Sequence, residues 1–304
     1  MIKSITAINY RGESIKLEMT RPEQSGFIIK DITGLFKPPK ANINTTKIAT
    51  LDGASYNSSR LDQRNVQLML EFMDNKTESI EDIRLKSYKY FPINKKVRLV
   101  VETDNRIVET EGIVEDNDPQ IFNAREYTTI TILCSDPYLY SPISNVTVFS
   151  GVKPAFKFPF SNKSLTEPTL KMGIIESKTE ANVYYDGDFT VGLTITIHAI
   201  GEATNLTIYN VTARESMRID TDKLATLTGS GIITGDTITI NTQARKKSIT
   251  LLREGVTYNI QNALDRGTKW LSLSEGDNVF AYRAERGASN LQFRMSNKTV
   301  YEGV

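Results

Sequence analysis

Apolar and polar residues alternate with a period of two along most of the chain, and this alternation predicts a mainly β protein. Residues 66–72 place Val, Leu, Leu and Phe in one phase, with mostly polar residues between them. Because successive side chains of a strand point to opposite faces, this segment predicts a strand with one buried face. The same pattern over 97–101 and 130–134 predicts two further strands of the same core.

The second half continues this alternation in many short segments. Turn-forming pairs such as Asp186-Gly187 and Gly276-Asp277 separate these segments. Many short strands at this spacing are typical of an antiparallel sandwich. The segments that alternate are 195–199, 206–209, 238–240, 249–251, 280–284 and 291–295.

Two segments of the first half depart from this pattern. Residues 77–90 predict a helix, because Ser79 and Asp82 resemble a capping box and Pro92 ends the apolar periodicity. Residues 37–60 are too hydrophilic to form core, and we expect them to form a long polar hairpin or arm. We expect the first region to be a β-sandwich or split barrel with one helix and a polar arm.

A change of character occurs in the run TILCSDPYLYSP, residues 131–142. Asp136-Pro137 ends the preceding strand, because proline has no backbone N–H to donate to the ladder. Tyr138, Leu139 and Tyr140 follow, where a flexible linker would be rich in Gly and Ser. We predict one domain over 1–142 and another over 143–304, with these three residues packed at the domain junction.

Composition and charge narrow the classes of function. The 304 residues carry 37 Lys and Arg against 36 Asp and Glu, so the net charge of +1 argues against a protein that binds nucleic acid by neutralising phosphates. No apolar run of signal-peptide or transmembrane type is present, and we expect a soluble protein made in a cytoplasm, with no membrane insertion. The one cysteine excludes an internal disulfide and a thiolate zinc cluster.

Candidate chemistry is sparse. No phosphate-binding loop, nucleophile elbow or paired-His motif occurs. His198 lies in a polar phase and should face solvent, whereas Cys134 is in phase with apolar residues and should be a buried thiol. We predict no enzyme, no catalytic or metal site and no cofactor. Three acidic pairs are expected in turns, with a loop-bound Ca²⁺ as the alternative: Asp116 and Asp118, Asp186 and Asp188, and Asp220 and Asp222.

Eight sequence runs, taken in order, point to one family. They are Gly53–Tyr56, Arg64–Phe72, Tyr90–Pro92, Lys95–Val97, Gly112–Glu115, Cys134–Tyr140, Trp270–Phe280 and Tyr301–Val304. Their succession resembles that of siphophage distal tail proteins (the Dit family), although no single run carries the resemblance. The first region resembles the N-terminal domain of that family, and the second resembles its C-terminal galectin-like β-sandwich.

The resemblance implies a structural protein of the virion tail tip, made in the cytoplasm of a bacterial host. Its first domain would form a homohexameric ring that joins the tail tube protein to the tail-associated tip protein. DNA would pass through this ring without sequence-specific binding. The second domains would be a docking platform for receptor-binding or accessory proteins. A prophage remnant or a phage-like bacteriocin remains an alternative to a phage.

The polar arm suits assembly, because a segment with little core of its own gains stability by burial against another chain. We expect Leu51, Tyr56 and Leu61 to lie in an interface between copies of the chain. A long surface loop is the alternative interpretation of this segment.

The alternative function is a carbohydrate-binding module for adhesion to the host. A sugar site needs exposed aromatic side chains beside planar polar groups. The candidate aromatic residues are Trp270, Tyr184, Tyr185 and Tyr282.

Overall fold

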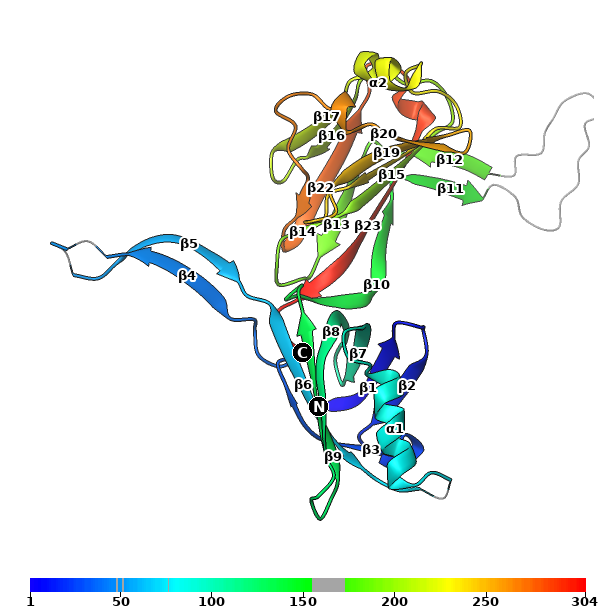
Figure 1. The fold of residues 1–304 in the computed structure, drawn as a ribbon. Coiled ribbons are helices and arrows are strands. Elements are labelled where there is room, and N and C mark those ends of the chain that lie inside the picture. The colour runs from blue at the N-terminus through cyan, green and yellow to red at the C-terminus, as the bar shows by residue number, and fades with distance from the viewer. Residues whose placement is uncertain (48, 51, 76, 155–172) are drawn as a thin grey trace, which may run out of the picture. The chain divides into compact units, whose positions relative to one another are not determined.

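The computed structural model describes residues 1–47, 49–50, 52–75, 77–154 and 173–304, and these form two compact units (Figure 1). Unit 1 comprises Met1–Ile143 and Val300–Val304, and unit 2 comprises Ser144–Thr299. The sequence interpretation assigned the whole of 143–304 to the second domain. In the structure the last five residues return to unit 1, because Tyr301 and Val304 pack against its core.

Unit 1 is built on a sheet in which β2, β1 and β7 lie in order along one edge of β8. The opposite edge of β8 pairs first with β10 and then with β9, and β6 and β3 follow β9 in turn. The elements of this unit are β1 (Ile2–Asn9), β2 (Ser14–Glu18), β3 (Phe27–Thr33), β4 (Ala41–Thr46), β5 (Ser55–Leu61), β6 (Arg64–Phe72), α1 (Ile80–Tyr90), β7 (Lys96–Thr103), β8 (Ile107–Gln120) and β9 (Tyr127–Cys134), and β10 (Leu139–Val148) leads into unit 2.

Strand β8 joins the two halves of this sheet. It pairs with β7 up to Ile113 and with β9 from Ile113 onward, and a bulge lies between Val114 and Asp116. A bulge bends its strand, so the two halves can enclose one core. The inward side chains of all three predicted strands are buried in that core, which confirms those strands.

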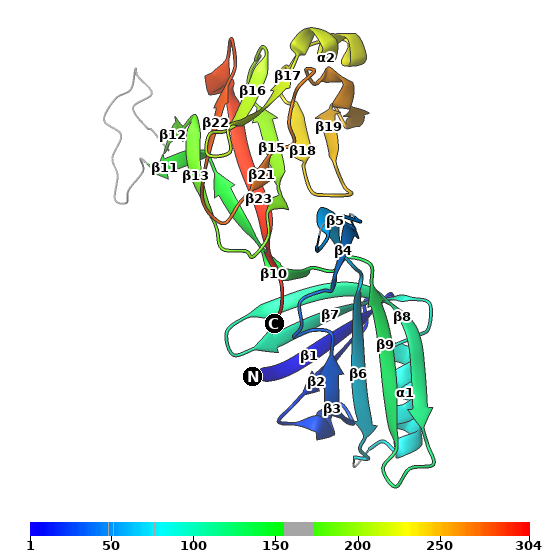
Figure 2. The ribbon, with the colours of Figure 1, turned by 90° about the vertical axis from the view of Figure 1, so that its left-hand side faces the viewer.

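Helix α1 (Figure 2) ends at Tyr90, as predicted, and begins at Ile80, directly after the predicted capping residue Ser79 and three residues later than the predicted start. The Ser79 hydroxyl accepts a hydrogen bond from the Asp82 backbone N–H at 3.3 Å, and the Asp82 carboxylate accepts one from the Ser79 N–H at 3.0 Å. This capping box satisfies two amide groups that have no partner within the helix. Ile83 points into the core and is fully buried.

Unit 2 is a sandwich of two antiparallel sheets. One sheet has the order β10-β23-β15-β18-β19-β20, and the other has the order β13-β22-β16-β17. The elements are β11 (Ser150–Pro154), β12 (Gly173–Ser177), β13 (Glu180–Tyr185), β14 (Val191–Gly192), β15 (Thr194–Ala199), β16 (Leu206–Asn210), β17 (Glu215–Ile219), α2 (Thr221–Thr228), β18 (Thr237–Asn241), β19 (Ser248–Arg253), β20 (Val256–Asn259), β21 (Ser272–Leu273), β22 (Gly276–Arg283) and β23 (Leu291–Tyr301).

The inner faces of the two sheets share one apolar core. Ile195 and Ile197 of β15 and Ile208 and Phe280 of the opposite sheet are all buried there, which confirms the predicted alternation. The protein is mainly β, as expected. Neither helix in the described part of the chain is long and apolar enough to cross a membrane.

Two local predictions were wrong or incomplete. Helix α2 was not predicted, although Asp220 caps it by accepting from two backbone N–H groups and Gly229 ends it at φ +83°. Its eight residues are too few for an apolar periodicity to be recognised. Asp116 and Asp118 lie within β8 and not in a turn, because the bulge beside them lets the strand continue with both side chains exposed.

Unit 2 contains a buried ion pair. The Arg253 guanidinium donates from Nε to Asp236 Oδ1 at 2.8 Å and from Nη2 to Asp236 Oδ2 at 2.6 Å. Asp236 is 1% exposed and Arg253 is 9% exposed. These hydrogen bonds with Asp236 raise the pKa of Arg253 above its ordinary value. A buried charge that loses its partner carries the full cost of its desolvation.

We therefore expect Asp236→Asn to lower the free energy of unfolding of unit 2 by about 3–5 kcal/mol. Urea denaturation of the full chain, followed by the Trp270 fluorescence of unit 2, measures this change. Glu275→Gln on the exposed surface of the same unit is the control and should change the value by less than about 0.5 kcal/mol. Equal effects of the two variants would contradict the prediction.

Candidate functional site

The arm, formed by β4, β5 and their connection, has almost no buried surface of its own. The two strands pair only with each other in the described structure, and every residue of 41–46 and 55–60 is exposed. Figure 1 shows the arm extending away from the sheet of unit 1. A two-stranded hairpin is at best marginally stable in water, so this segment gains most if another surface covers it.

The register of the hairpin gives the arm two different faces. Asn42 lies opposite Arg60 and Asn44 opposite Ser58, so these residues share a polar face. Ile43 lies opposite Ser59 on the other face.

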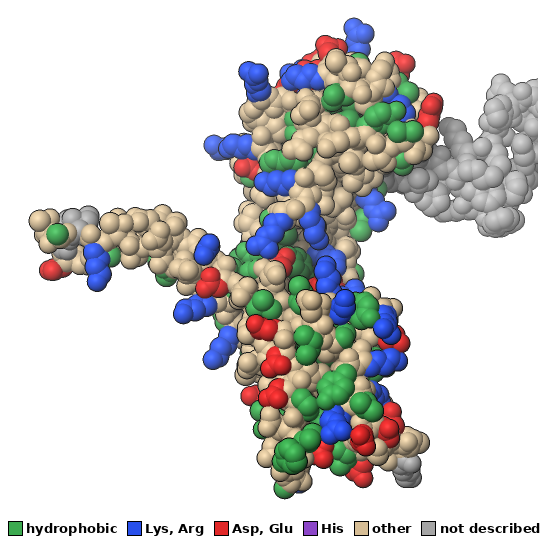
Figure 3. Space-filling view, viewed as in Figure 1, with side chains coloured by type: hydrophobic (Ala, Val, Ile, Leu, Met, Phe, Trp, Pro, Cys, Tyr) green, Lys and Arg blue, Asp and Glu red, His purple; other side chains and the backbone are tan. Residues whose placement is uncertain are grey.

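A bulge places Tyr56 on the same face as Ile43. The pairing shifts between Asn44 and Thr45, so that Thr45 lies opposite Tyr56 and Asn57 is the extra residue. Consistent with this placement, the hydroxyls of Tyr56 and Ser59 are 2.7 Å apart. Ile43 is 60% exposed and Tyr56 is 62% exposed. In Figure 3 most of the arm has the colour of backbone and uncharged polar side chains, with a few charged side chains along it.

The predicted interface residues are placed differently by the structure. Tyr56 is exposed on the arm, Leu61 is half-buried where β5 ends, and Leu51 lies outside the described residues. Ile43 was not among the predicted residues. Its alternation with Asn42 and Asn44 was the signal that could have identified it. The role of these side chains in an interface stays a prediction.

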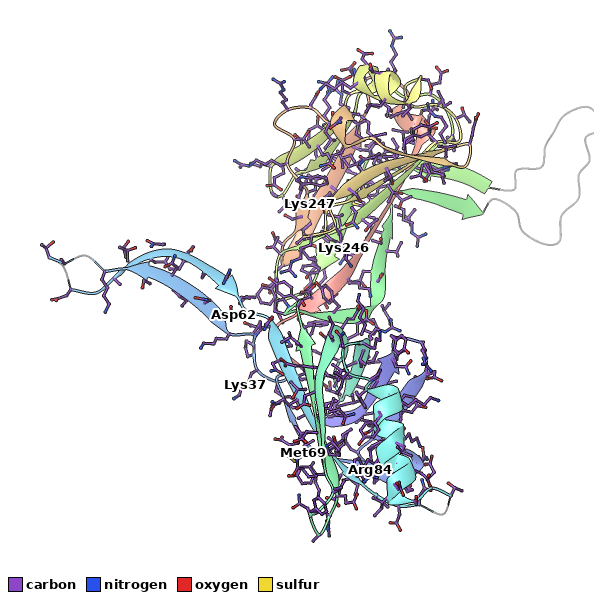
Figure 4. All side chains as sticks on the ribbon, viewed as in Figure 1. Lys37, Asp62, Met69, Arg84, Lys246 and Lys247 are labelled. Carbon is purple, nitrogen blue, oxygen red and sulfur yellow. The ribbon has the colours of Figure 1, made fainter. Side chains whose placement is uncertain are left out.

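Figure 4 labels Lys37 and Asp62, where the chain enters and leaves the arm. Arg64 belongs to this root of the arm, because it follows Asp62 by two residues and binds the Lys37 carbonyl. The side chain is 3% exposed. Nε donates to the Pro137 carbonyl at 2.7 Å, and Nη2 donates to the Glu302 carbonyl at 2.7 Å.

The remaining terminal nitrogen of Arg64 binds the segment between β3 and the arm. Nη1 donates to the Gly34 carbonyl at 2.6 Å and to the Lys37 carbonyl at 2.9 Å, with the Leu35 carbonyl at 3.5 Å. We call the carbonyls of Gly34, Lys37, Pro137 and Glu302 the carbonyl cage. Three segments far apart in the sequence thus meet at one cation.

Two glycines allow this close approach. Gly34 has φ +82°, and a Cβ atom there would lie 1.9 Å from the Asn65 carbonyl oxygen. Gly303 lies beside the same segment, since a Cβ atom there would be 3.2 Å from the Phe36 carbonyl oxygen. A side chain at Gly34 would push the backbone away from Asn65, and the positive φ there adds strain. A side chain at Gly303 would require a shift of only a few tenths of an ångström.

The Glu302 carboxylate attracts the charge of Arg64 but accepts no hydrogen bond from it in the described part of the chain. In the described part of the chain, every hydrogen-bond acceptor on Arg64 is a backbone carbonyl. Burial lowers the pKa of Arg64 below its ordinary value. The sequence carried a signal for this residue, because Arg64 occupies the same inward phase as Val66 and Leu68.

The predicted junction residues come directly after Pro137 of the carbonyl cage in the sequence. Leu139 is fully buried in the core of unit 1, and Tyr138 and Tyr140 are half-buried. The Tyr140 hydroxyl donates to Asp136 Oδ2 at 2.7 Å, and Tyr140 lies opposite Glu109 of β8. A role of these residues in fixing the junction stays a prediction.

Cys134 is buried and His198 is exposed, as the alternation of apolar and polar residues predicts. Cys134 is a buried free thiol whose pKa is raised by burial, and His198 is exposed beside the Thr237 hydroxyl. Within the described ranges, no group of three or more His, Cys, Asp or Glu side chains is placed to hold a metal ion. Lys246 and Lys247 are exposed on the surface of unit 2 (Figure 4).

Comparison with known proteins gives matches in structure. No protein-family model matches the sequence, and no curated protein matches it in sequence. The Dit protein of phage SPP1, described as a paradigm of the hub adsorption apparatus in phages that infect Gram-positive bacteria, is 13% identical with a TM-score of 0.63. That match covers 97% of this chain and 99% of the SPP1 chain.

Two structures of the phage P2 baseplate in its activated conformation also match, each at 11% identity. They cover 100% and 99% of this chain and the same shares of the P2 chains, with TM-scores of 0.49 and 0.45. The expected fold rests on the SPP1 match: this chain has the fold of a phage distal tail protein.

Proposed function

We propose that this chain is a structural distal tail protein of a phage tail tip and that it is not an enzyme. The observation that supports this most is the fold shared with the SPP1 Dit protein over nearly the full length of both chains. The neighbour is described as part of a hub adsorption apparatus, and a hub is built from protein contacts and not from a catalytic centre. The exposed arm is the element of this chain best suited to such contacts.

In this proposal unit 1 assembles with copies of itself into a hexameric ring. The ring joins the tail tube protein to the tail-associated tip protein, and DNA passes through it. The near-neutral net charge of +1 suits a conduit that DNA crosses without binding. The protein would be made in the cytoplasm of a bacterial host and would act in the virion tail tip.

Unit 2 would be the docking platform for receptor-binding or accessory proteins. Tyr138, Leu139 and Tyr140 would pack at the domain junction, because a connector with large side chains can be fixed by burial where a Gly/Ser linker cannot.

The apolar face of the arm is proposed to bind a second copy of the chain. Two apolar side chains more than half exposed on one face of a hairpin expose surface that water solvates poorly. Burying each contributes about 1.5–3 kcal/mol. A neighbouring copy also supplies a partner for the unpaired edges of β4 and β5.

A second candidate function, carbohydrate binding, has one specific observation in its favour. Of the aromatic candidates, Tyr185 and Tyr282 are buried and Trp270 is half-buried against the core, but Tyr184 is 68% exposed. It lies opposite Asp277, whose Oδ1 accepts a hydrogen bond from the Asn182 amide at 2.7 Å. An exposed ring beside planar polar groups is the arrangement that a sugar site uses.

The proposed hexameric ring should be visible in electron micrographs of the purified protein. Negative-stain electron microscopy should show six-fold rings with a central opening, and native mass spectrometry should give six times the chain mass of 34.1 kDa. A monomer at every concentration tested would contradict the proposed assembly.

The arm predicts a defect that is specific to assembly. Ile43→Ser together with Tyr56→Ser should weaken each contact between copies by about 3 kcal/mol or more, because two apolar groups lose their burial. This corresponds to a loss of affinity of more than about a hundredfold, measured by sedimentation as a function of concentration. The fold of the monomer, followed by circular dichroism, should not change.

The matched control for the arm carries Val211→Ser and Val256→Ser, since both valines are 52% exposed and belong to unit 2. The control should assemble as the unmodified chain does. If the arm variant also assembled normally, the arm would be a surface loop and not an interface.

The carbohydrate candidate predicts binding of the full chain to a glycan array and loss of that binding in Tyr184→Ala. Tyr209→Ala is the control, because Tyr209 is 36% exposed on another strand of the same sheet. An array without signal for the unmodified chain would leave docking of proteins as the function of unit 2.

A further inference from the structure

The carbonyl cage connects the arm with the two segments through which the chain leaves and re-enters unit 1. Gly34 and Lys37 lead into the arm, Pro137 precedes β10, and Glu302 follows β23. Strands β10 and β23 are the segments that continue into unit 2. One guanidinium therefore holds the root of the arm and both connecting segments.

The chemistry of the cage makes these contacts depend on one another. A buried guanidinium whose hydrogen bonds all go to backbone carbonyls remains charged, and the dipoles of those carbonyls must supply most of its solvation. If one segment moves away, the cation loses part of that solvation, and the other carbonyls lose a charge-assisted donor. The most stable arrangement is therefore the one in which all three segments are in place together.

We propose that Arg64 is a positioning residue that couples the arm to the connecting segments. A partner that holds the arm would fix Gly34 and Lys37, stabilise the cage and thereby order 135–143 and 300–304. By thermodynamic linkage, order in these segments would strengthen binding at the arm to the same degree. The part of this inference that concerns a partner rests on the proposed self-assembly, whereas the coupling itself is a property of the single chain.

The contacts also separate this inference from a general role in stability. Arg64 begins β6, and Ile83 packs at the other end of that strand, where Gly26 precedes the pairing of Phe27 with Phe72. Ile83→Ala should therefore destabilise unit 1 without touching the cage. Any effect that only Arg64 variants produce belongs to the cage.

The test measures hydrogen exchange of the monomer by mass spectrometry in three segments: 34–40, 135–143 and 300–304. Arg64→Lys keeps the charge but removes the fork of donors, and Arg64→Met removes both. Both variants should speed exchange at least tenfold in all three segments together. Ile83→Ala should change exchange there by less than twofold. A response confined to one segment, or the same response in the control, would overturn the coupling.

A shortened chain provides a second, independent test. Ending the chain at Tyr301 removes the Glu302 carbonyl and should speed exchange at 34–40 in the chain with Arg64. The same truncation should have no further effect in Arg64→Met, because the cage is already lost. Additive effects of the two changes would overturn the proposal.

Self-association separates a positioning role of Arg64 from a purely structural one, because a residue that only stabilises the folded monomer should not change the affinity between copies. Arg64→Lys should raise the concentration for half-association at least tenfold, whereas Ile83→Ala should leave it unchanged as long as the monomer is folded. If the unmodified chain forms no assembly, the proposed ring fails, and the exchange experiments still decide whether the cage couples its segments.

Discussion

The buried charge of Arg64 is the constraint on which the root of unit 1 depends. An isolated cation loses several kcal/mol of solvation on burial, and hydrogen bonds to a charged group each return only about 1.5–3 kcal/mol. No single carbonyl is sufficient, so several must converge. The buried arginine of unit 2 is solvated differently, because Arg253 forms an ion pair with Asp236 and also donates to the Ser230 hydroxyl and the Gly231 carbonyl. Arg64 has no ion pair of this kind, and its hydrogen bonds in the described part of the chain all go to carbonyls of three backbone segments.

The hydrogen bonds of Arg64 explain how an exposed arm can leave unit 1 at a fixed position. The hairpin has no core, so nothing within β4 and β5 fixes its direction. Direction must come from the residues before and after it, and those before it are held at Gly34 and Lys37. A stable root with an uncovered tip suits an element that must reach a neighbour, because less conformational entropy is then lost on binding.

The parts of the fold that were predictable from sequence are those set by local chemistry. The strands over 66–72 and 130–134 follow from alternation, and α1 follows from its capping box. Contacts between distant segments were not predictable. The inward phase of Arg64 indicated a buried charge, but nothing local indicated that Pro137 and Glu302 would supply its acceptors. The galectin-like character of unit 2 rested on resemblance and stays a prediction.

The arm shows that some features could not be predicted from the sequence because they depend on how two strands pair. Within β5, Tyr56 has the parity of Ser58 and Arg60, so regular alternation would place its ring on the polar face. The extra residue Asn57 reverses that parity and brings Tyr56 to the face of Ile43. A single unpaired residue thus turns two separate exposed apolar side chains into one apolar face. No property of Asn57 alone reveals this, because a bulge is defined only by the strand opposite.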